Sequence, residues 1–440
     1  MPNVRKIVLK ALLKLEKDDG YSNIIIDNAI QTAGLEGRDA NFAAALFYGV
    51  LERKLTLDYI IQTYSKQGSN KIKPIVLQVL RMGLYQLLYM DKVPDSAAVN
   101  ESVRLIKAMG LSSLSGYVNA VLRAFLRDGK QIKYPDDPVE RLTVEFSCPR
   151  PIVDSFIADY GLPLAKTILS GFTKQRGVTI RINTVKIEQK AFEDMLNAAG
   201  VAFEKSEICE HALLLKQQGS VEKLCGFEKG YFHVQDLSSQ LCAKALGAKP
   251  GDRVLDVCAA PGGKSFTIAE NMQNNGEVLA LDKYPQKVEM IQKSAKRLGL
   301  SCVKADVNDA GFFNSNLGSF NKVLCDLPCS GLGILGKKPE IRYKNVAFLD
   351  KLPVLQYDLL DKSAQYLENG GVLVYSTCTL RQAENREIAD RFLQEHNDFE
   401  PFPVLPGVKR CVDEPEHILT LFPGIHNTDG FFISAFQKKG

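Results

Sequence analysis

The first 140 residues carry apolar side chains at the three- and four-residue spacing of an amphipathic helix. These apolar stripes run through residues 4–15, 76–88 and 118–125. Turn-forming residues separate the stripes at Asp18-Asp19-Gly20, Gly68-Ser69-Asn70 and Pro94-Asp95. The pattern predicts an all-helical domain over residues 1–140, which ends near Pro135-Asp136-Asp137-Pro138.

Strand signals begin only after this helical region. Between residues 141 and 235, strand candidates at 178–183 and 230–234 flank a helical stretch at 189–199, which predicts a small α+β insert. Over residues 236–440, short apolar strands alternate with helices. The strand candidates there are 253–257, 278–281, 302–305, 322–326, 371–375 and 430–436. The alternation predicts an α/β domain on a doubly wound, Rossmann-like sheet with its ligand at the carboxyl edge.

Composition restricts the class of protein. A chain of 440 residues with 45% hydrophobic and 24% charged residues is typical of a soluble globular protein of two or three domains. No apolar run reaches the length of a membrane span, so we expect no membrane association. Lys6, Lys10 and Lys14 interrupt the apolar residues of the first helix, whereas a secretory signal needs an uninterrupted apolar stretch. We therefore expect a cytoplasmic protein. We also expect a monomer.

The ten cysteines are scattered as single residues without metal-type pairs. This spacing argues against a disulfide framework and against a zinc site, so no metal is expected. The net charge is +4, and residues 1–140 hold all of it, with 19 basic and 15 acidic residues against 36 and 36 in the remainder. A phosphate-binding surface and an ordinary solvated helical surface both account for that excess.

A glycine turn follows the first strand of the α/β domain. The segment reads Cys258-Ala259-Ala260-Pro261-Gly262-Gly263-Lys264-Ser265. A dinucleotide fingerprint would need G-x-G-x-x-G, and a phosphate-binding P-loop would need glycine in place of Cys258. Asp282 and Asp306 end the next two strands, where carboxylates can accept ribose hydroxyls and an adenine amine. The combination favours S-adenosylmethionine, although a single aspartate at a strand end is often only a helix cap.

Two further strand ends carry cysteines, Cys329 after Asp326 and Cys378 after Thr377. Methylation of pyrimidine carbon 5 needs a thiolate that adds to carbon 6, an acid near N3 and a base near carbon 5. Thr379 to Gln382 has capping-box spacing, which predicts a helix that starts there and lowers the pKa of the neighbouring thiol. An isolated cysteine is more often an inert core residue, but two at adjacent strand ends favour chemistry.

These segments resemble the RNA (cytosine-5) methyltransferases of the NOL1/NOP2/Sun family. The matching stretches are Cys258 to Lys264, Asp326-Leu327-Pro328-Cys329-Ser330-Gly331, Ser376-Thr377-Cys378-Thr379 with Glu384-Asn385, Asp429-Gly430-Phe431-Phe432, and Gln235-Asp236. Residues 1–140 resemble the NusB-like helical RNA-binding domain, through Phe47-Tyr48-Gly49-Val50-Leu51, Ala97-Ala98-Val99-Asn100-Glu101 and Asn119-Ala120-Val121-Leu122-Arg123. Together they resemble the bacterial enzymes that methylate small-subunit (16S) ribosomal RNA.

The resemblance implies a role for each residue. Cys378 is the nucleophile, Cys329 assists release, and Asp326 hydrogen-bonds the ring near the cofactor. S-adenosyl-L-methionine would be held by Cys258, Ala259, Ala260, Pro261, Gly262, Gly263, Lys264, Asp282, Asp306 and Asp326. Lys337, Lys338 and Arg342 could contact RNA phosphates or form a solvated charge run.

Other activities fit the sequence less well. Another RNA such as tRNA is the alternative substrate. A DNA cytosine methyltransferase would not need Cys378 or the helical domain, and a P-loop kinase would need the missing first glycine.

Overall fold

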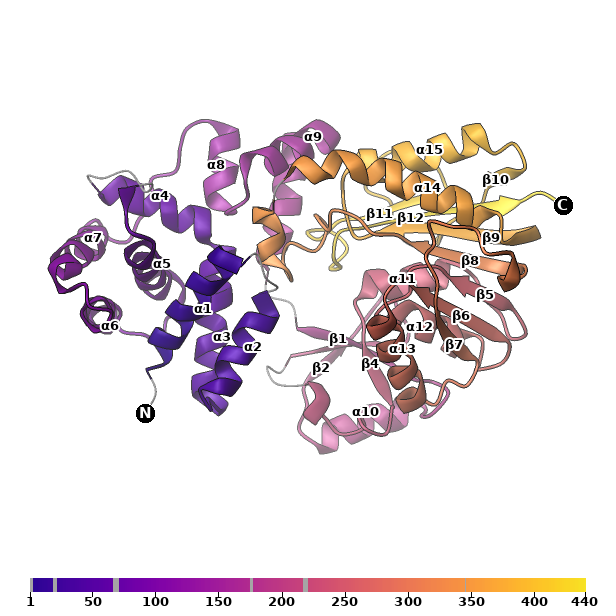
Figure 1. Cartoon of the computed structure of the whole chain (residues 1–440), viewed down its shortest axis with the longest axis horizontal. Helices are drawn as coiled ribbons and strands as arrows, with labels where there is room; N and C mark the ends of the chain where they lie inside the picture. The colour runs from indigo at the N-terminus through magenta and orange to yellow at the C-terminus, as the bar shows by residue number, and fades with distance from the viewer. Residues whose placement is uncertain (1–2, 19–21, 66–70, 175–176, 217–220, 345) are drawn as a thin grey trace. The chain divides into compact units, whose positions relative to one another are not determined.

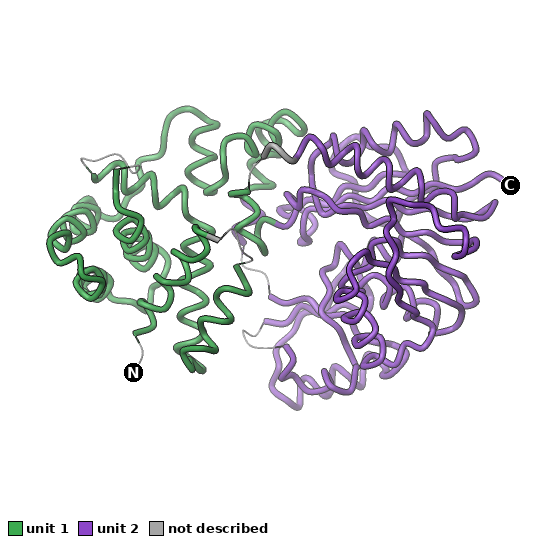
Figure 2. The backbone as a smooth tube through the Cα atoms, viewed as in Figure 1, with its two compact units in different colours: residues 1–169, 335–344 green, residues 170–334, 345–440 purple. Residues whose placement is uncertain are grey.

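The computed structural model describes residues 3–18, 22–65, 71–174, 177–216, 221–344 and 346–440. The chain divides into two compact units, residues 1–169 with 335–344 and residues 170–334 with 345–440 (Figure 2). The predicted turns at Asp19-Gly20 and Gly68-Ser69-Asn70 lie outside the described residues. The three-domain division at residues 140 and 235 stays a prediction, because compactness separates two units only.

The first unit is helical, as predicted (Figure 1). Its helices are α1 (Val4–Asp18), α2 (Ser22–Thr32), α3 (Gly37–Glu52), α4 (Lys54–Tyr64), α5 (Pro74–Tyr89), α6 (Asp95–Ala108), α7 (Ser115–Arg127), α8 (Pro138–Glu145) and most of α9 (Arg150–Thr173). The predicted apolar stripes face one core: Val8 and Leu12 of α1, Leu80 of α5 and Leu122 of α7 are all buried there. Helix α9 bends at Gly161, where φ is 75°, just before Pro163.

The second unit begins with a small sheet of order β2-β3-β1-β4, built from β1 (Val178–Ile182), β2 (Phe203–Lys205), β3 (Ala212–Leu215) and β4 (Phe232–Val234). Helix α10 (Gln189–Ala198) packs on it through Phe192 and Leu196, which share a core with Ile180 and Ile182. The strand and helix candidates of the insert are therefore confirmed. Sequence patterning missed β2 and β3, which are only three and four residues long.

The larger sheet has the order β10-β12-β9-β8-β5-β6-β7, with β11 paired to β12. Its strands are β5 (Arg253–Asp256), β6 (Glu277–Asp282), β7 (Val303–Val307), β8 (Phe320–Asp326), β9 (Leu367–Thr377), β10 (Phe399–Pro401), β11 (Ile418–Leu421) and β12 (Phe431–Lys438). Strands β5 to β9 pair in parallel, and β12 runs antiparallel to β9. The chain order reverses at β5, so the carboxyl ends of β5, β6 and β8 open on a common ligand-binding edge.

Helices cover both faces of this sheet (Figure 1). On one face lie α11 (Leu237–Ala245), α12 (Gly263–Asn271) and α13 (Pro285–Leu298); on the other lie α14 (Leu352–Ala364) and α15 (Arg386–Glu395). Adjacent residues of β5 show the alternation, since Val254 packs with the first set and Leu255 with the second. The doubly wound α/β fold is thereby confirmed.

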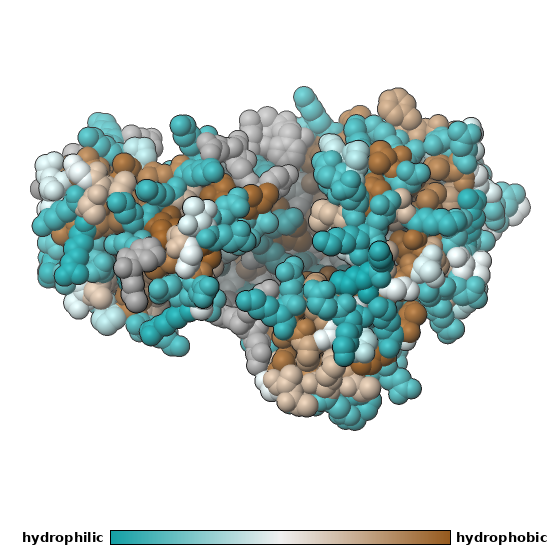
Figure 3. Space-filling model, turned by 60° about the horizontal axis from the view of Figure 1, so that its bottom comes forward, coloured by the Kyte–Doolittle hydropathy of each residue, from teal (hydrophilic) through white to brown (hydrophobic). Residues whose placement is uncertain are grey.

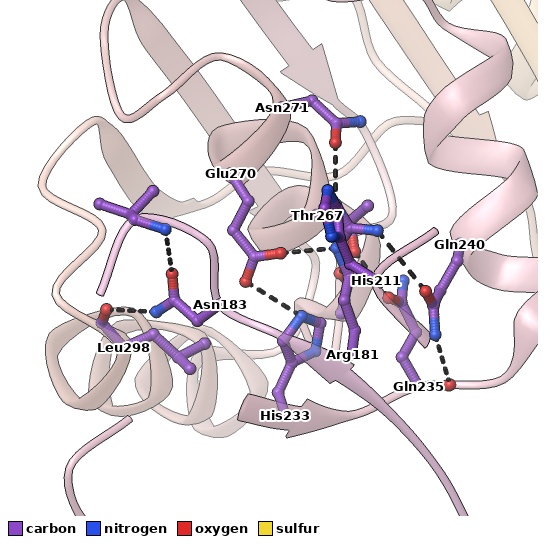
Figure 4. A network of polar contacts seen from close by, with 12 residues as sticks. Arg181, Asn183, His211, His233, Gln235, Gln240, Thr267, Glu270, Asn271 and Leu298 are labelled. Atoms are coloured by element: carbon purple, nitrogen blue, oxygen red, sulfur yellow. Dashed lines mark hydrogen bonds and ion pairs between the residues drawn. The ribbon is translucent and has the colours of Figure 1, made fainter. Parts of the chain in front are cut away.

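A buried polar network joins the insert to α12 (Figure 4). Nε of Arg181 in β1 donates to Oε2 of Glu270 at 2.6 Å, and its Nη2 donates to Oδ1 of Asn271 at 2.9 Å. Nε2 of His233 in β4 lies 3.3 Å from Oε1 of Glu270. The side chains of Arg181 and Glu270 are 7% and 0% exposed. Since a buried charge is costly without its partner, these contacts hold the insert sheet against α12.

The described surface is mixed in character. The face in Figure 3 is mostly hydrophilic, with separate hydrophobic areas between the polar side chains. Large apolar side chains that stand out into solvent include Phe312 and Val354, at 73% and 69% exposure. Of the helices that the structure describes, none combines the length and the apolar character needed to cross a membrane.

Candidate active site

The two thiols predicted from strand ends meet in the structure. Strands β8 and β9 are parallel neighbours with Asp326 opposite Ser376, so the loops that follow start side by side. Cys329 lies three residues beyond β8 and Cys378 directly after β9, and their sulfur atoms are 3.3 Å apart. The fold therefore places two nucleophilic side chains, 49 residues apart in the chain, in direct contact.

A glycine connects the two cysteine loops through its backbone. The amide of Gly333 donates to the carbonyl of Cys378 at 2.9 Å, and its carbonyl accepts from the amide of Gly430 at 2.8 Å. A Cβ at Gly333 would lie 2.0 Å from the carbonyl oxygen of Gly430, so no larger residue fits. The loops after β8 and β9 and the start of β12 thus form one hydrogen-bonded group.

Asp326 and Lys264 form an ion pair beside the thiols. Nζ of Lys264, near the start of α12, lies 2.6 Å from Oδ2 of Asp326, and Oδ1 of Asp326 accepts from the hydroxyl of Ser376 at 2.9 Å. Burial opposes the charged form of Lys264, but the neighbouring carboxylate of Asp326 outweighs it and raises the lysine pKa. The ammonium group therefore stays charged and fixes the orientation of the carboxylate.

The glycine turn after β5 leads directly into α12. Gly262 caps the helix with φ 103°, a left-handed conformation that glycine adopts readily. A Cβ at Gly262 would lie 2.4 Å from the ring of Phe266, so packing alone requires glycine there. A Cβ at Gly263 would meet only Gln235, at 3.7 Å. Packing therefore does not explain the second glycine, and a helix N-terminus without a side chain leaves room for a ligand.

Asp282 and Asp306 lie at the carboxyl ends of β6 and β7. Asp282 is buried, and its Oδ1 accepts from the amide of Tyr284 at 3.1 Å. Asp306 is exposed, and its Oδ1 accepts from the amide of Val307. The amide of Ala259 donates to the carbonyl of Leu281 at 2.8 Å, which ties the glycine turn to the end of β6. Both carboxylates thus belong to the same edge of the sheet as the turn.

The ten cysteines, all of them described, are free thiols. Burial raises the pKa of Cys242 and Cys325 to about 12, which suits inert core residues. For Cys329 the hydrogen bond to Cys378 comes first and burial second, and together they raise its pKa well above the usual range. Cys329 therefore keeps its proton near neutral pH.

Among the described residues, no group of three His, Cys, Asp or Glu side chains is placed to hold a metal ion.

The predicted helix start directly after Cys378 is wrong. The segment after Cys378 forms only a 3₁₀ turn, η7 (Gln382–Glu384), and α15 starts at Arg386, so Thr379 caps no helix. Its hydroxyl instead lies 2.7 Å from the hydroxyl of Ser330, and that contact helps join the two cysteine loops.

Arg342 is not available to RNA phosphates. It is 2% exposed, and its guanidinium donates to the backbone carbonyls of Glu52, Phe146, Ser147 and Leu335, all within the first unit. Arg342 is thus a buried structural residue of the first unit, whose Nη1 and Nη2 donate to backbone carbonyls. Lys337 and Lys338 are exposed, so their phosphate contacts stay a prediction.

Sequence patterning gave no role to two buried residues beside the thiols. In the sequence, Glu384 only belonged to the segment that resembles the family motif. In the structure, its carboxylate accepts from the amide of Ser330 at 2.9 Å. Gln356 of α14 donates to the carbonyl of Pro328 at 2.9 Å. Gln356 shares a helix face with the buried Leu359 and Leu360. In the sequence, the signal for Gln356 was a single amide side chain among the apolar residues of one helix face.

Known proteins match the whole chain. A family model described as 16S rRNA methyltransferase RsmB/F matches residues 243–437, a NusB family model matches residues 2–127, and a ferredoxin-like domain of RsmF/B-like methyltransferases matches residues 148–222. The "Probable ribosomal RNA small subunit methyltransferase B" of Bacillus subtilis (strain 168) is 37% identical over 447 aligned positions, which cover 100% of this chain and 99% of the relative. The chain belongs to the RsmB/F methyltransferase family.

Solved structures share the fold of this chain. The crystal structure of PH0851 has a TM-score of 0.82 and 24% identity, covering 100% of this chain and 99% of the other, which shows the same fold. A methyltransferase homolog protein from Pyrococcus horikoshii has a TM-score of 0.62 and 27% identity over 69% of this chain and 99% of its own. The expected NusB-like helical domain and Rossmann-like methyltransferase domain are both confirmed.

Proposed function

We propose that this RsmB/F-family methyltransferase transfers a methyl group from S-adenosyl-L-methionine to carbon 5 of a cytosine in 16S ribosomal RNA. The observation that carries the proposal is the pair of sulfur atoms, Cys329 and Cys378, 3.3 Å apart at the carboxyl edge of the sheet. Two thiols in contact suit a reaction in which one bonds to the base and the other assists its release. The ribosomal RNA substrate is inferred from the relative in Bacillus subtilis, which is named as a probable ribosomal RNA small subunit methyltransferase.

The residues around the glycine turn fit S-adenosyl-L-methionine. Gly263 leaves room for close approach at the N-terminus of α12, and Asp282 and Asp306 offer carboxylates at the next two strand ends. The backbone from Cys258 to Lys264 would hold the methionyl part, and the two carboxylates the ribose and adenine. When bound, the cofactor supplies an electrophilic methyl group.

Cys378 acts first in the proposed reaction. Its thiolate adds to carbon 6 of the cytosine, and the electron pair of the 5,6 double bond is released toward carbon 5, which then takes up the methyl group. The hydrogen bond to Cys378 and burial raise the pKa of Cys329, so Cys329 does not compete with Cys378 as the nucleophile. Asp326, oriented by Lys264 and Ser376, hydrogen-bonds the ring near N3.

Release requires the proton on carbon 5 to leave. A base next to Cys329 takes that proton, the electron pair re-forms the 5,6 double bond, and the thiolate of Cys378 departs. One C–H bond is replaced by one C–CH₃ bond, and the cysteine is regenerated. The target cytosine must be unstacked to reach the pocket, and the NusB-like domain would orient the RNA through its shape and phosphates.

Single alanine variants test these assignments. Cys378→Ala should abolish both methyl transfer and any protein–RNA adduct, whereas Cys329→Ala should accumulate an adduct that survives a denaturing gel. Cys225→Ala, a half-buried cysteine of the insert, serves as the control. An adduct that persists in Cys378→Ala and disappears in Cys329→Ala would reverse the two roles. Mapping of 5-methylcytosine on 16S rRNA and on tRNA in parallel decides between the two substrates.

A further inference from the structure

Glu384 is a buried carboxylate that contacts the loop of Cys329. Its side chain is 0% exposed, and its Oε2 accepts from the backbone amide of Ser330 at 2.9 Å and from Nε2 of Gln356 at 3.0 Å. Its Oε1 lies 3.1 Å from Nη1 of Arg381. A carboxylate without exposure has strong interactions with its few partners, because water does not screen them.

Gln356 extends this contact to the other side of the cysteine. The same Nε2 that donates to Glu384 also donates to the carbonyl of Pro328 at 2.9 Å. The carbonyl before Cys329 and the amide after it are therefore both held, one through Gln356 and one by Glu384 directly. This arrangement restricts both peptide groups that flank the thiol.

The same glutamate is also connected to the loop of Cys378. The hydroxyl of Tyr375, near the end of β9, donates to the backbone carbonyl of Glu384. The side-chain amide of Asn385 donates to the carbonyl of Thr379 at 3.0 Å and accepts from the hydroxyl of Thr377 at 2.6 Å. Glu384 and its neighbour thus contact the residues on both sides of Cys378 as well as the loop of Cys329.

We propose that Glu384 is a positioning residue that keeps the thiol of Cys329 against the sulfur of Cys378, with Gln356 as its partner. The proposal deepens the function proposed above and rests on it for its catalytic consequence. The claim that Glu384 positions the two sulfur atoms can be tested without RNA. The hydrogen bond to Cys378 and burial raise the pKa of Cys329, and the charge of Glu384 adds to this effect. The carboxylate therefore favours a protonated Cys329.

The first test uses the protein without RNA. Alkylation by iodoacetamide at limiting reagent, mapped by mass spectrometry, gives the ratio of modified Cys329 to modified Cys378. In Glu384→Ala we expect this ratio to rise at least threefold, since Cys329 loses both its anchor and the nearby negative charge. Glu384→Gln should lie between, because its amide oxygen can still accept from Ser330 while its charge is gone. The control is Glu387→Ala, an exposed glutamate in the first turn of α15.

The second test follows the reaction. Glu384→Ala should slow methyl transfer at least tenfold and increase the fraction of enzyme trapped as RNA adduct, while the affinity for S-adenosylhomocysteine stays within twofold of the wild type. Partial recovery in Glu384→Gln separates positioning from simple loss of structure. Gln356→Leu, which keeps the volume and removes the donor to Pro328, should show the same changes to a smaller degree.

The outcomes separate the two claims. A folded Glu384→Gln or Gln356→Leu protein with the wild-type alkylation ratio and the wild-type adduct fraction would overturn the positioning role. Absence of methyl transfer and of adduct in the wild type would instead overturn the proposed function. In that case the alkylation ratio still decides whether Glu384 holds the two thiols together.

Discussion

Two glutamates of the second unit, Glu270 and Glu384, have side chains with 0% exposure, and each contacts an arginine. Their surroundings differ. Glu270 accepts a hydrogen bond from Arg181 of β1 and lies beside His233 of β4, so its contacts join the insert to α12 (Figure 4). Glu384 accepts a hydrogen bond from the backbone amide of Ser330 next to the thiols. The side chain of its arginine partner, Arg381, is 15% exposed. The same buried group joins two structural elements in one place and contacts the loop of a proposed catalytic thiol in the other.

Loss of Glu270 should have the largest effect on stability. Glu270→Leu leaves Arg181 as a buried charge without its carboxylate, which costs about 3–5 kcal/mol in the free energy of unfolding. Denaturant unfolding of the purified protein measures the change. The control is Glu204→Ala, whose partner is Lys216; that pair is 56% and 54% exposed, and its loss should cost less than about 1 kcal/mol.

A double substitution shows whether the charge itself is responsible. Arg181→Met combined with Glu270→Leu removes both charges and keeps apolar volume, so it should be more stable than Glu270→Leu alone. If the double variant is the less stable of the two, packing and not the ion pair dominates at this position. The comparison with Glu384 would then lose its electrostatic basis.

The sequence predicted the sheet because residues 253–257, 322–326 and 371–375 are short, mainly apolar runs. Parallel pairing then required the loops after β8 and β9 to be neighbours, so the thiol pair followed from topology. The partners of the two glutamates did not follow. Arg181 and Glu270 are 89 residues apart in the chain, and no local pattern links them.

The two errors have a common physical cause. Arg342 looked like a surface cation in a basic run, yet its guanidinium is buried and donates to backbone carbonyls of the first unit. Thr379 had the spacing of a helix cap, yet its hydroxyl pairs with Ser330 from another loop. In both cases a long-range polar contact outweighed a local preference, and sequence spacing contains no information about such contacts.

Asp256 extends the comparison to a buried carboxylate whose direct side-chain partner is a hydroxyl. Oδ2 of Asp256 accepts from Ser265 at 2.6 Å, and burial raises its pKa to about 7 from an ordinary value of 3.8. Between these two values the folded protein binds more protons than the unfolded chain, so the contribution of Asp256 to stability falls as the pH rises toward 7.

Asp256→Asn should remove this pH dependence, because its amide oxygen can still accept from Ser265. We expect the melting temperature of the variant relative to the wild type to increase between pH 5 and pH 8. Asp194→Asn, at a side chain with 59% exposure, provides the control and should follow the wild type at each pH. A constant difference between Asp256→Asn and the wild type over this range would show that the group is already ionised at pH 5.

The smallest expected change in stability concerns Gly263, on the reacting side of the sheet edge. Alanine there would contact Gln235 at 3.7 Å, an ordinary distance, so the free energy of unfolding should change by less than about 1 kcal/mol. Binding of S-adenosylhomocysteine, measured by calorimetry, should weaken at least tenfold, since the added methyl group occupies the space proposed for the cofactor. Gly262→Ala is the matched control: φ of 103° and the ring of Phe266 at 2.4 Å predict a clear loss of stability. Wild-type affinity in Gly263→Ala would mean that the cofactor lies elsewhere on this edge, and that only packing requires a glycine in the turn.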